Sequence, residues 1–189
     1  YFSVDDSRKI LETAKKYNLV PRMHADEFVY SGASELAKEI GAVSADHLMA
    51  INDAGITALS QSDTIATLLP GTTFFLNKKN YADGRKLIDN NCSVALATDF
   101  NPGTCTIRSL SNIMFLAIQN CGLTIEEAFL GVTYNGAKSL NKQNEIGLVK
   151  ENYNADLILW NINSIDEIPY WFDSANTRIF KVIKNGKVI

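Results

Sequence analysis

The segment Val94–Thr104, VALATDFNPGT, gives the strongest indication of the fold. Its first five residues are apolar or small, which is typical of a strand buried on both faces in a parallel sheet. The strand ends abruptly at Asp99, and Asn101–Thr104 has the composition of a loop. In α/β barrels and open α/β sheets, ligands bind at this carboxyl end of the strands. Asp99 is therefore a candidate site residue, although a cap for the following helix would explain the spacing equally well.

Three similar strands precede this one, and each alternates with a helical segment. The expected strands are Leu19–His24, Ala42–Asp46, Thr64–Leu69 and Ser93–Thr98. The expected helices are Ser7–Tyr17, Ser34–Ile40, Asp53–Ser60 and Tyr81–Asn90. Four β-then-α units with short connections predict a parallel sheet with right-handed crossovers.

The last third of the chain has a different pattern. Helices are expected first, at Ile107–Asn120, Thr124–Leu130 and Tyr134–Leu140, and Thr124 and Glu127 have the spacing of a capping box. Strands are expected next, at Ala155–Trp160 and Thr177–Ile183, with a hairpin turn at Asn185-Gly186. We therefore expect a barrel portion over residues 1–145 and a small β appendage over 146–189.

Composition narrows the class of protein. The 189 residues are 46% hydrophobic and 21% charged, which suits one sizeable globular core. A net charge of −3 spread along the chain argues against a nucleic-acid partner. No apolar run is long enough to cross a membrane. Three cysteines without CxxC spacing favour a reduced, cytoplasmic chain over a disulfide framework.

The chain has two histidines, and both fall at or just after a predicted strand end. His24 begins HADE and His47 ends SADH, so a barrel would bring both to the same mouth as Asp99. Imidazole and carboxylate suit zinc or a similar divalent ion, and Glu27, one turn past His24, could act as acid or base. Either histidine alone would more simply be a half-buried residue bonded to a loop carbonyl. Three candidates at strand ends together favour a site.

The number of ligands and strands points to part of a larger unit. A catalytic zinc usually takes three protein ligands and a water, whereas this chain offers His24 and Asp99, with His47 as a possible third. A closed eight-stranded barrel also needs about 250 residues. We therefore predict an α/β fold that forms the back half of a TIM-like (β/α)8 barrel enzyme; the resemblance described next implies that this barrel is a metal-dependent hydrolase.

Four motifs are specific enough to compare with known families, namely HADE at His24–Glu27, SADH at Ser44–His47, LLPGTTFFL at Leu68–Leu76 and LATDFNPGT at Leu96–Thr104. Together they resemble the imidazolonepropionase family, which belongs to the amidohydrolase superfamily. The resemblance continues over essentially the whole chain, through GLVKENYNADLILW at Gly147–Trp160 and IPY at Ile168–Tyr170. TDFNPGT with HADE upstream is its most specific part.

The resemblance implies hydrolysis of 4-imidazolone-5-propanoate to N-formimidoyl-L-glutamate with one divalent metal, zinc or iron. It implies that His24 and Asp99 bind the metal, that Glu27 contacts the ring and transfers protons, and that His47 orients or polarises the ring carbonyl. It also implies that Asn101, Gly103 and Thr104 bind the substrate, with the glycine allowing close approach of the backbone. Taken alone, Asn101-Pro102-Gly103 is a plain turn.

One family motif is missing from this chain. The His-x-His metal motif of the first barrel strand does not occur here. We therefore expect the enzyme to be a longer protein, a cytoplasmic homodimer acting on a small-molecule substrate, and the isolated segment to be inactive. Two alternatives stay open, namely another amidohydrolase such as a deaminase, and a non-catalytic binding domain. Asn101, Gly103 and Thr104 favour a substrate that carries a carboxylate.

Overall fold

A four-stranded parallel sheet organises the first two thirds of the molecule. The computed structural model describes residues 2–172 and 174–189. The strands follow one another across the sheet in chain order, and every neighbouring pair is parallel, as predicted. β4 is buried along its whole length, which also agrees with its apolar sequence. The strands are β1 (Arg22–Ala25), β2 (Ser44–His47), β3 (Ile65–Leu68) and β4 (Val94–Leu96).

Helices follow each strand and pack against the sheet. α2 contacts β1 and β2, whereas α6, α7 and α8 contact β4. The helices are α1 (Val4–Lys16), α2 (Ala33–Glu39), α3 (Asp53–Ser60), α4 (Pro70–Phe75), α5 (Gly84–Asp89), α6 (Leu110–Cys121), α7 (Ile125–Val132), α8 (Tyr134–Ser139) and α9 (Glu167–Tyr170), with a 3-10 turn at Ala175–Arg178.

Capping side chains set several helix starts. Ser3 and Asn52 accept backbone N–H groups at the starts of α1 and α3. At α7 the Thr124 hydroxyl accepts the N–H of Glu127 while the Glu127 carboxylate accepts the N–H of Thr124. The capping box expected from the sequence is therefore confirmed, and two otherwise unpaired donors are satisfied.

Two short helices are not indicated by the sequence pattern. The strand expected at Thr64–Leu69 is present as β3 and ends at Leu68, but α4 begins at Pro70, directly after it. Proline is well suited to the first turn of a helix because its missing N–H would have no partner there. The four-residue helix α9 is too short to give a periodic signal.

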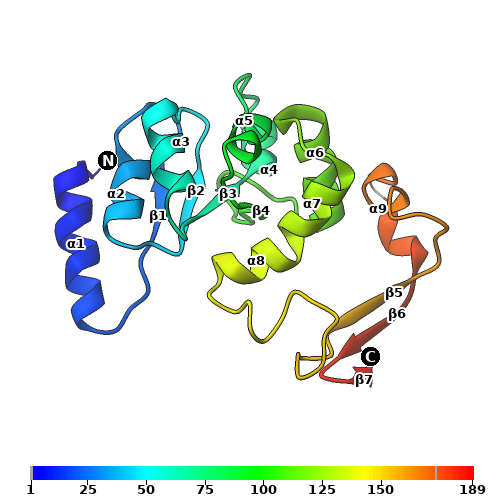
Figure 1. Cartoon of the computed structure of the whole chain (residues 1–189). Helices are drawn as coiled ribbons and strands as arrows, with labels where there is room; N and C mark the ends of the chain where they lie inside the picture. Colours follow the sequence, from blue (N-terminus) through cyan, green and yellow to red (C-terminus); the bar gives the residue numbers. More distant parts are fainter. Residues whose placement is uncertain (1, 173) are drawn as a thin grey trace.

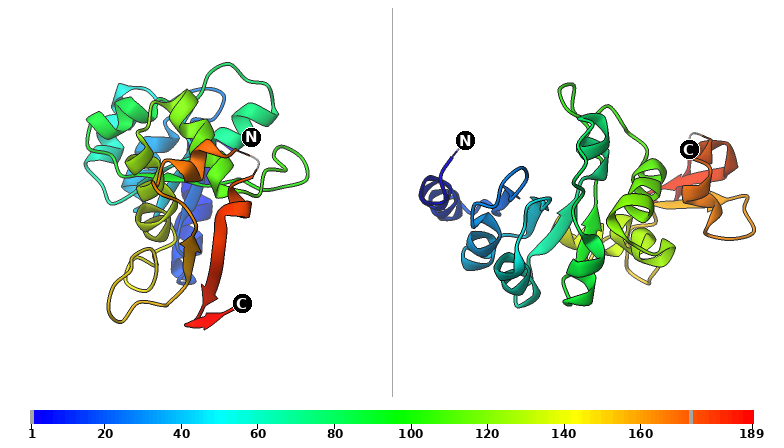
Figure 2. Two further views of the ribbon diagram at one scale, coloured as in Figure 1. Left: turned by 90° about the vertical axis from the view of Figure 1, so that its right-hand side faces the viewer. Right: turned by 90° about the horizontal axis from the view of Figure 1, so that it is seen from above.

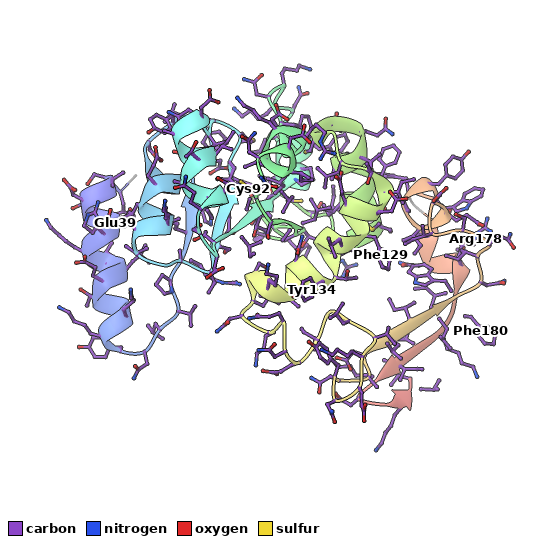
Figure 3. The ribbon with its side chains drawn as sticks, in the orientation of Figure 1. Glu39, Cys92, Phe129, Tyr134, Arg178 and Phe180 are labelled. Atoms are coloured by element: carbon purple, nitrogen blue, oxygen red, sulfur yellow. The ribbon has the colours of Figure 1, made fainter. Side chains whose placement is uncertain are left out.

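A separate antiparallel sheet forms the end of the chain. It has the order β5-β6-β7, and the turn at Asn185-Gly186 has φ of 50° and 76°, as a tight hairpin requires. This sheet lies at the opposite end of the molecule from α1 (Figures 1 and 2). Figure 3 shows Phe180 on its outer side, where that side chain is 66% exposed. The strands are β5 (Leu157–Trp160), β6 (Ile179–Lys184) and β7 (Lys187–Val188).

The apolar core is shared by the parallel sheet and its helices. It contains the thiol of Cys92, labelled in Figure 3, which hydrogen-bonds the carbonyl of Ile56. No helix among the described residues is long and apolar enough to span a membrane. The large side chains that are fully buried in the core include Leu36, Leu48, Leu59, Ile65, Leu68, Leu87, Ile113 and Met114.

Candidate functional site

Three of the predicted site residues lie together at the carboxyl ends of β1 and β2. The imidazole rings of His24 and His47 are 4.7 Å apart between centroids and are tilted by 58°. Nδ1 of His47 lies 3.5 Å from Oε1 of Glu27. One ligand atom from each of these residues lies within 4.8 Å of the other two. Two imidazoles and a carboxylate therefore face a common space.

The turn that carries Glu27 is fixed by its neighbour Asp26. The buried Asp26 carboxylate accepts hydrogen bonds from Ser31 and Ser34, including the Ser31 backbone N–H at 2.7 Å. The Asp26 carbonyl accepts the N–H of Ala50 at 2.7 Å, which ties the turn after β1 to the turn after β2. These bonds keep Glu27 and His47 on adjoining turns.

His47 is a buried, neutral imidazole. Its side chain is 3% exposed, and burial, together with the charge of His24, lowers its pKa to about 4. Nε2 is buried and has no hydrogen-bond partner among the described residues. No bond from this nitrogen to a loop carbonyl is present among the described residues, so Nε2 is free to meet a ligand, and the role of His47 in a site stays a prediction.

Glu27 is the partly buried acid of the group. Burial raises the pKa of its carboxyl group, the charge of His24 opposes that rise, and the charge of Asp99 adds to it. A carboxyl group whose pKa moves toward neutrality is better able to accept and release a proton at physiological pH.

Asp99 follows β4 and is held by two neighbours. Its Oδ2 accepts a 2.6 Å hydrogen bond from the Thr72 hydroxyl, and its carbonyl accepts one of 2.8 Å from the Asn101 amide. Because the cap of the next helix is Ser109, the alternative reading of Asp99 as that cap is wrong. The carboxylate lies close enough to influence the pKa of both His47 and Glu27, yet it is not one of the three clustered groups.

The loop after Asp99 is closed by its own hydrogen bonds. Oδ1 of Asn101 accepts the N–H groups of Gly103 and Thr104 at 2.8 and 2.7 Å, and its Nδ2 donates to the Thr104 hydroxyl at 2.7 Å. These polar groups shape the turn in this structure. Their roles in binding a substrate remain predictions.

The residues present fit a divalent metal ion. Imidazole and carboxylate are suitable ligands for zinc or iron, and Nε2 of His47 is a buried nitrogen with no hydrogen-bond partner among the described residues. Among the described residues the clustered donors are His24, Glu27 and His47, whereas the sequence resemblance implies His24 and Asp99. His24 belongs to both sets.

Thr72 is a site residue that the sequence analysis does not indicate. It follows β3, the strand whose carboxyl end carries no histidine or acid, and it contacts Asp99 across 27 positions of sequence. The rule that ligands gather at the ends of parallel strands, applied to β3 as well, would have drawn attention to it.

Comparison with known proteins identifies the family and supports the fold. The amidohydrolase family profile matches residues 2–189. An imidazolonepropionase of Kosmotoga olearia is 50% identical over 188 residues, covering 100% of this chain and 46% of its own. An imidazolonepropionase of Bacillus cytotoxicus is 43% identical over 187 residues, covering 99% and 44%. The chain thus spans about half the length of the curated relatives it matches.

Solved structures share the fold at low sequence identity. An adenosine deaminase from Xanthomonas campestris with bound zinc superposes with a TM-score of 0.81 at 14% identity, covering 98% of this chain and 48% of that one. A 5-methylcytosine deaminase from Klebsiella pneumoniae gives 0.77 at 18% identity, covering 98% and 51%. The prediction of an α/β chain that forms part of a barrel is confirmed.

Proposed function

The chain belongs to the amidohydrolase family, and from that premise we propose that it forms the C-terminal half of an imidazolonepropionase. The proposed reaction adds water to 4-imidazolone-5-propanoate and opens the ring to N-formimidoyl-L-glutamate. Residues 1–145 would supply half of the barrel, and residues 146–189 part of a small β domain.

The convergence of His24, Glu27 and His47 at the ends of β1 and β2 carries this proposal. The same residues stand in motifs that resemble the imidazolonepropionase family, and the 50% identity extends over the entire chain. Identity at that level, together with a site of suitable chemistry, favours this substrate over those of the structural neighbours, whose identity of under 20% supports the fold alone.

His24 and Asp99 would hold the metal ion, together with ligands from the missing half of the barrel. A divalent ion bound there supplies a Lewis acid that activates water at neutral pH. The zinc in the Xanthomonas campestris deaminase supports a divalent ion in this fold. Zinc and iron use the same nitrogen and oxygen ligands, so either ion suits this pair.

Glu27 would move the proton during ring opening. Water attacks the ring carbonyl carbon, Glu27 accepts a proton from it, and the bond between that carbon and the ring nitrogen breaks. Glu27 then returns the proton to the departing nitrogen, which balances the reaction. Its raised pKa supports both transfers.

His47 would stabilise the charge that develops on the ring carbonyl oxygen. The low pKa keeps this imidazole neutral at pH 7, so it has one N–H to donate. Its 3.5 Å separation from Glu27 places the donor beside the proton carrier. Asn101, Gly103 and Thr104 would bind the propanoate group from the loop that follows β4.

The experiment joins this chain to the N-terminal half of the Kosmotoga olearia relative and measures hydrolysis of 4-imidazolone-5-propanoate. We expect the joined protein to be active and the chain alone to be inactive. Asp99→Ala should reduce kcat/KM by orders of magnitude, because a metal ligand is lost. Asp89→Ala is the matched control, since Asp89 forms a surface ion pair with Arg85.

Two results would contradict the proposal. One is a joined protein that folds and binds metal but does not hydrolyse the imidazolone, which would favour another amidohydrolase substrate. The other is an Asp99→Ala protein as active as the unchanged one. A cytoplasmic location and a homodimeric assembly remain parts of the proposal, and size measurement of the joined protein tests the latter.

A further inference from the structure

We propose that Thr72 is a positioning residue that fixes the orientation of the Asp99 carboxylate. The inference rests on the proposed function in one respect, which is the role of Asp99 as a metal ligand. It adds a residue that follows β3 to a site whose other residues lie at or after the carboxyl ends of β1, β2 and β4.

The contact between the two side chains is short and partly buried. The Thr72 hydroxyl donates to Oδ2 of Asp99 at 2.6 Å, and Thr72 is only 1% exposed. Hydrogen bonds of this length between a hydroxyl and a carboxylate are among the stronger ones in proteins. With Oδ2 occupied by Thr72, the carboxylate is oriented and Oδ1 is the oxygen left for another partner.

The start of α4 places the hydroxyl where it is needed. Pro70 begins the helix directly after β3, and Gly71 follows it. A Cβ atom at Gly71 would lie 2.8 Å from Ile113 and 3.0 Å from the sulfur of Cys105. The glycine therefore lets the first turn of α4 approach the segment around Asp99 closely enough for Thr72 to reach it.

Asp99 itself needs support from its neighbours. Its φ of 50° is a left-handed conformation that residues other than glycine seldom adopt. The Asn101 amide holds the backbone carbonyl, while Thr72 holds the side chain. Such strain persists only where several contacts fix it. The two bonds together determine where the carboxylate points.

The test compares Thr72→Val with Thr72→Ser in the joined protein, using zinc affinity as the principal measurement. Valine keeps the shape of threonine and removes the donor, whereas serine keeps the donor. Competition with a chelator should show zinc affinity reduced about 10- to 100-fold in Thr72→Val, the usual effect of losing a partner of a metal ligand. Thr72→Ser should stay within about threefold of the unchanged protein.

Thr73→Val is the matched control. Thr73 is the next residue of α4, is also buried, and directs its hydroxyl to the sulfur of Met49. It should keep its zinc affinity, and thermal unfolding should show that all three variants are folded. Unchanged zinc affinity in Thr72→Val, or equal losses in the valine and serine variants or in Thr73→Val, would overturn the proposal.

The zinc measurement separates this inference from the proposed function. If the joined protein binds zinc but does not hydrolyse the imidazolone, the proposed substrate is wrong, while the difference between Thr72→Val and Thr72→Ser still decides the role of Thr72. If the imidazolone is hydrolysed and zinc affinity does not depend on the Thr72 hydroxyl, the inference fails and the function stands.

Discussion

Asp26, His47 and Asp99 share an uncommon backbone conformation. Their φ angles are 46°, 80° and 50°, and each residue lies at or just after the end of a parallel strand. Such conformations cost free energy and tend to occur where a side chain must take a particular direction for function. Here they coincide with the turns that bring Glu27 and His47 together, which agrees with the proposed site.

Replacement of Glu27 by glutamine distinguishes its two possible roles, which are proton carrier and metal ligand. Glutamine keeps the size of the side chain but cannot accept and return a proton. If Glu27 is the proton carrier, Glu27→Gln in the joined protein should lower kcat by about 10²- to 10⁴-fold while metal content is retained. Kinetics and elemental analysis of the same sample provide both measurements.

If Glu27→Gln instead loses its metal, Glu27 is a metal ligand, as its position beside His24 and His47 allows. Glu12→Gln, on the exposed side of α1, is the control for removing one carboxylate.

The candidate residues were predictable where an uncommon residue type marked a strand end. His24 and His47 are the only histidines of the sequence. The structure places both at the carboxyl ends of neighbouring strands, with the Glu27 carboxylate beside His47. Thr72 was not predictable in this way, because a threonine after Pro-Gly has no distinctive chemistry. Asn101 was ambiguous because the same amide suits a turn and a ligand.

Helix predictions succeeded where capping residues and periodicity agreed. The expected bounds of α3, Asp53–Ser60, are the observed ones, with Asn52 as the cap. α4 and α9 were missed because each has less than two turns and contains a proline. In such short helices tertiary packing determines the conformation rather than local propensity.

The capping box of α7 provides a stability test. Thr124→Ala removes the hydroxyl that accepts the Glu127 N–H, so the free energy of unfolding should fall by about 1 kcal/mol. Chemical denaturation of the joined protein measures this change. Thr57→Ala is the control, because Thr57 lies within α3 on its exposed side and bonds only the carbonyl of Asp53. Equal losses of unfolding free energy in both variants would show that the Thr124 cap stabilises the protein no more than an ordinary threonine on a helix surface.

The chain exposes more surface than a compact protein of its size. A folded monomer of 20.9 kDa is expected to expose about 9,000 Å², whereas this chain exposes 10853 Å². Large apolar side chains such as Phe180 on β6 and Phe2 before α1 contribute to the difference. We propose that further strands and helices cover part of this surface when the barrel is complete.

The arrangement of the sheet was predictable, but its completion was not. Alternation of strands and helices, with the right-handed crossover rule, leaves few choices for the order of β1 to β4. Nothing in local sequence tells which residues cover the outer edges of β1 and β4. Further metal ligands, including any His-x-His pair, would come from other strands of the barrel and leave no signal in these residues.

We propose above all that separate strand ends of this chain present His24 and Asp99 to one hydrolytic metal ion. The most direct measurement is anomalous diffraction at the zinc edge from crystals of the joined protein grown with zinc. We predict one strong peak in contact with the side chains of both His24 and Asp99, with Glu27 and His47 beside it. A peak bound elsewhere, or none at this edge of the sheet, would contradict the claim.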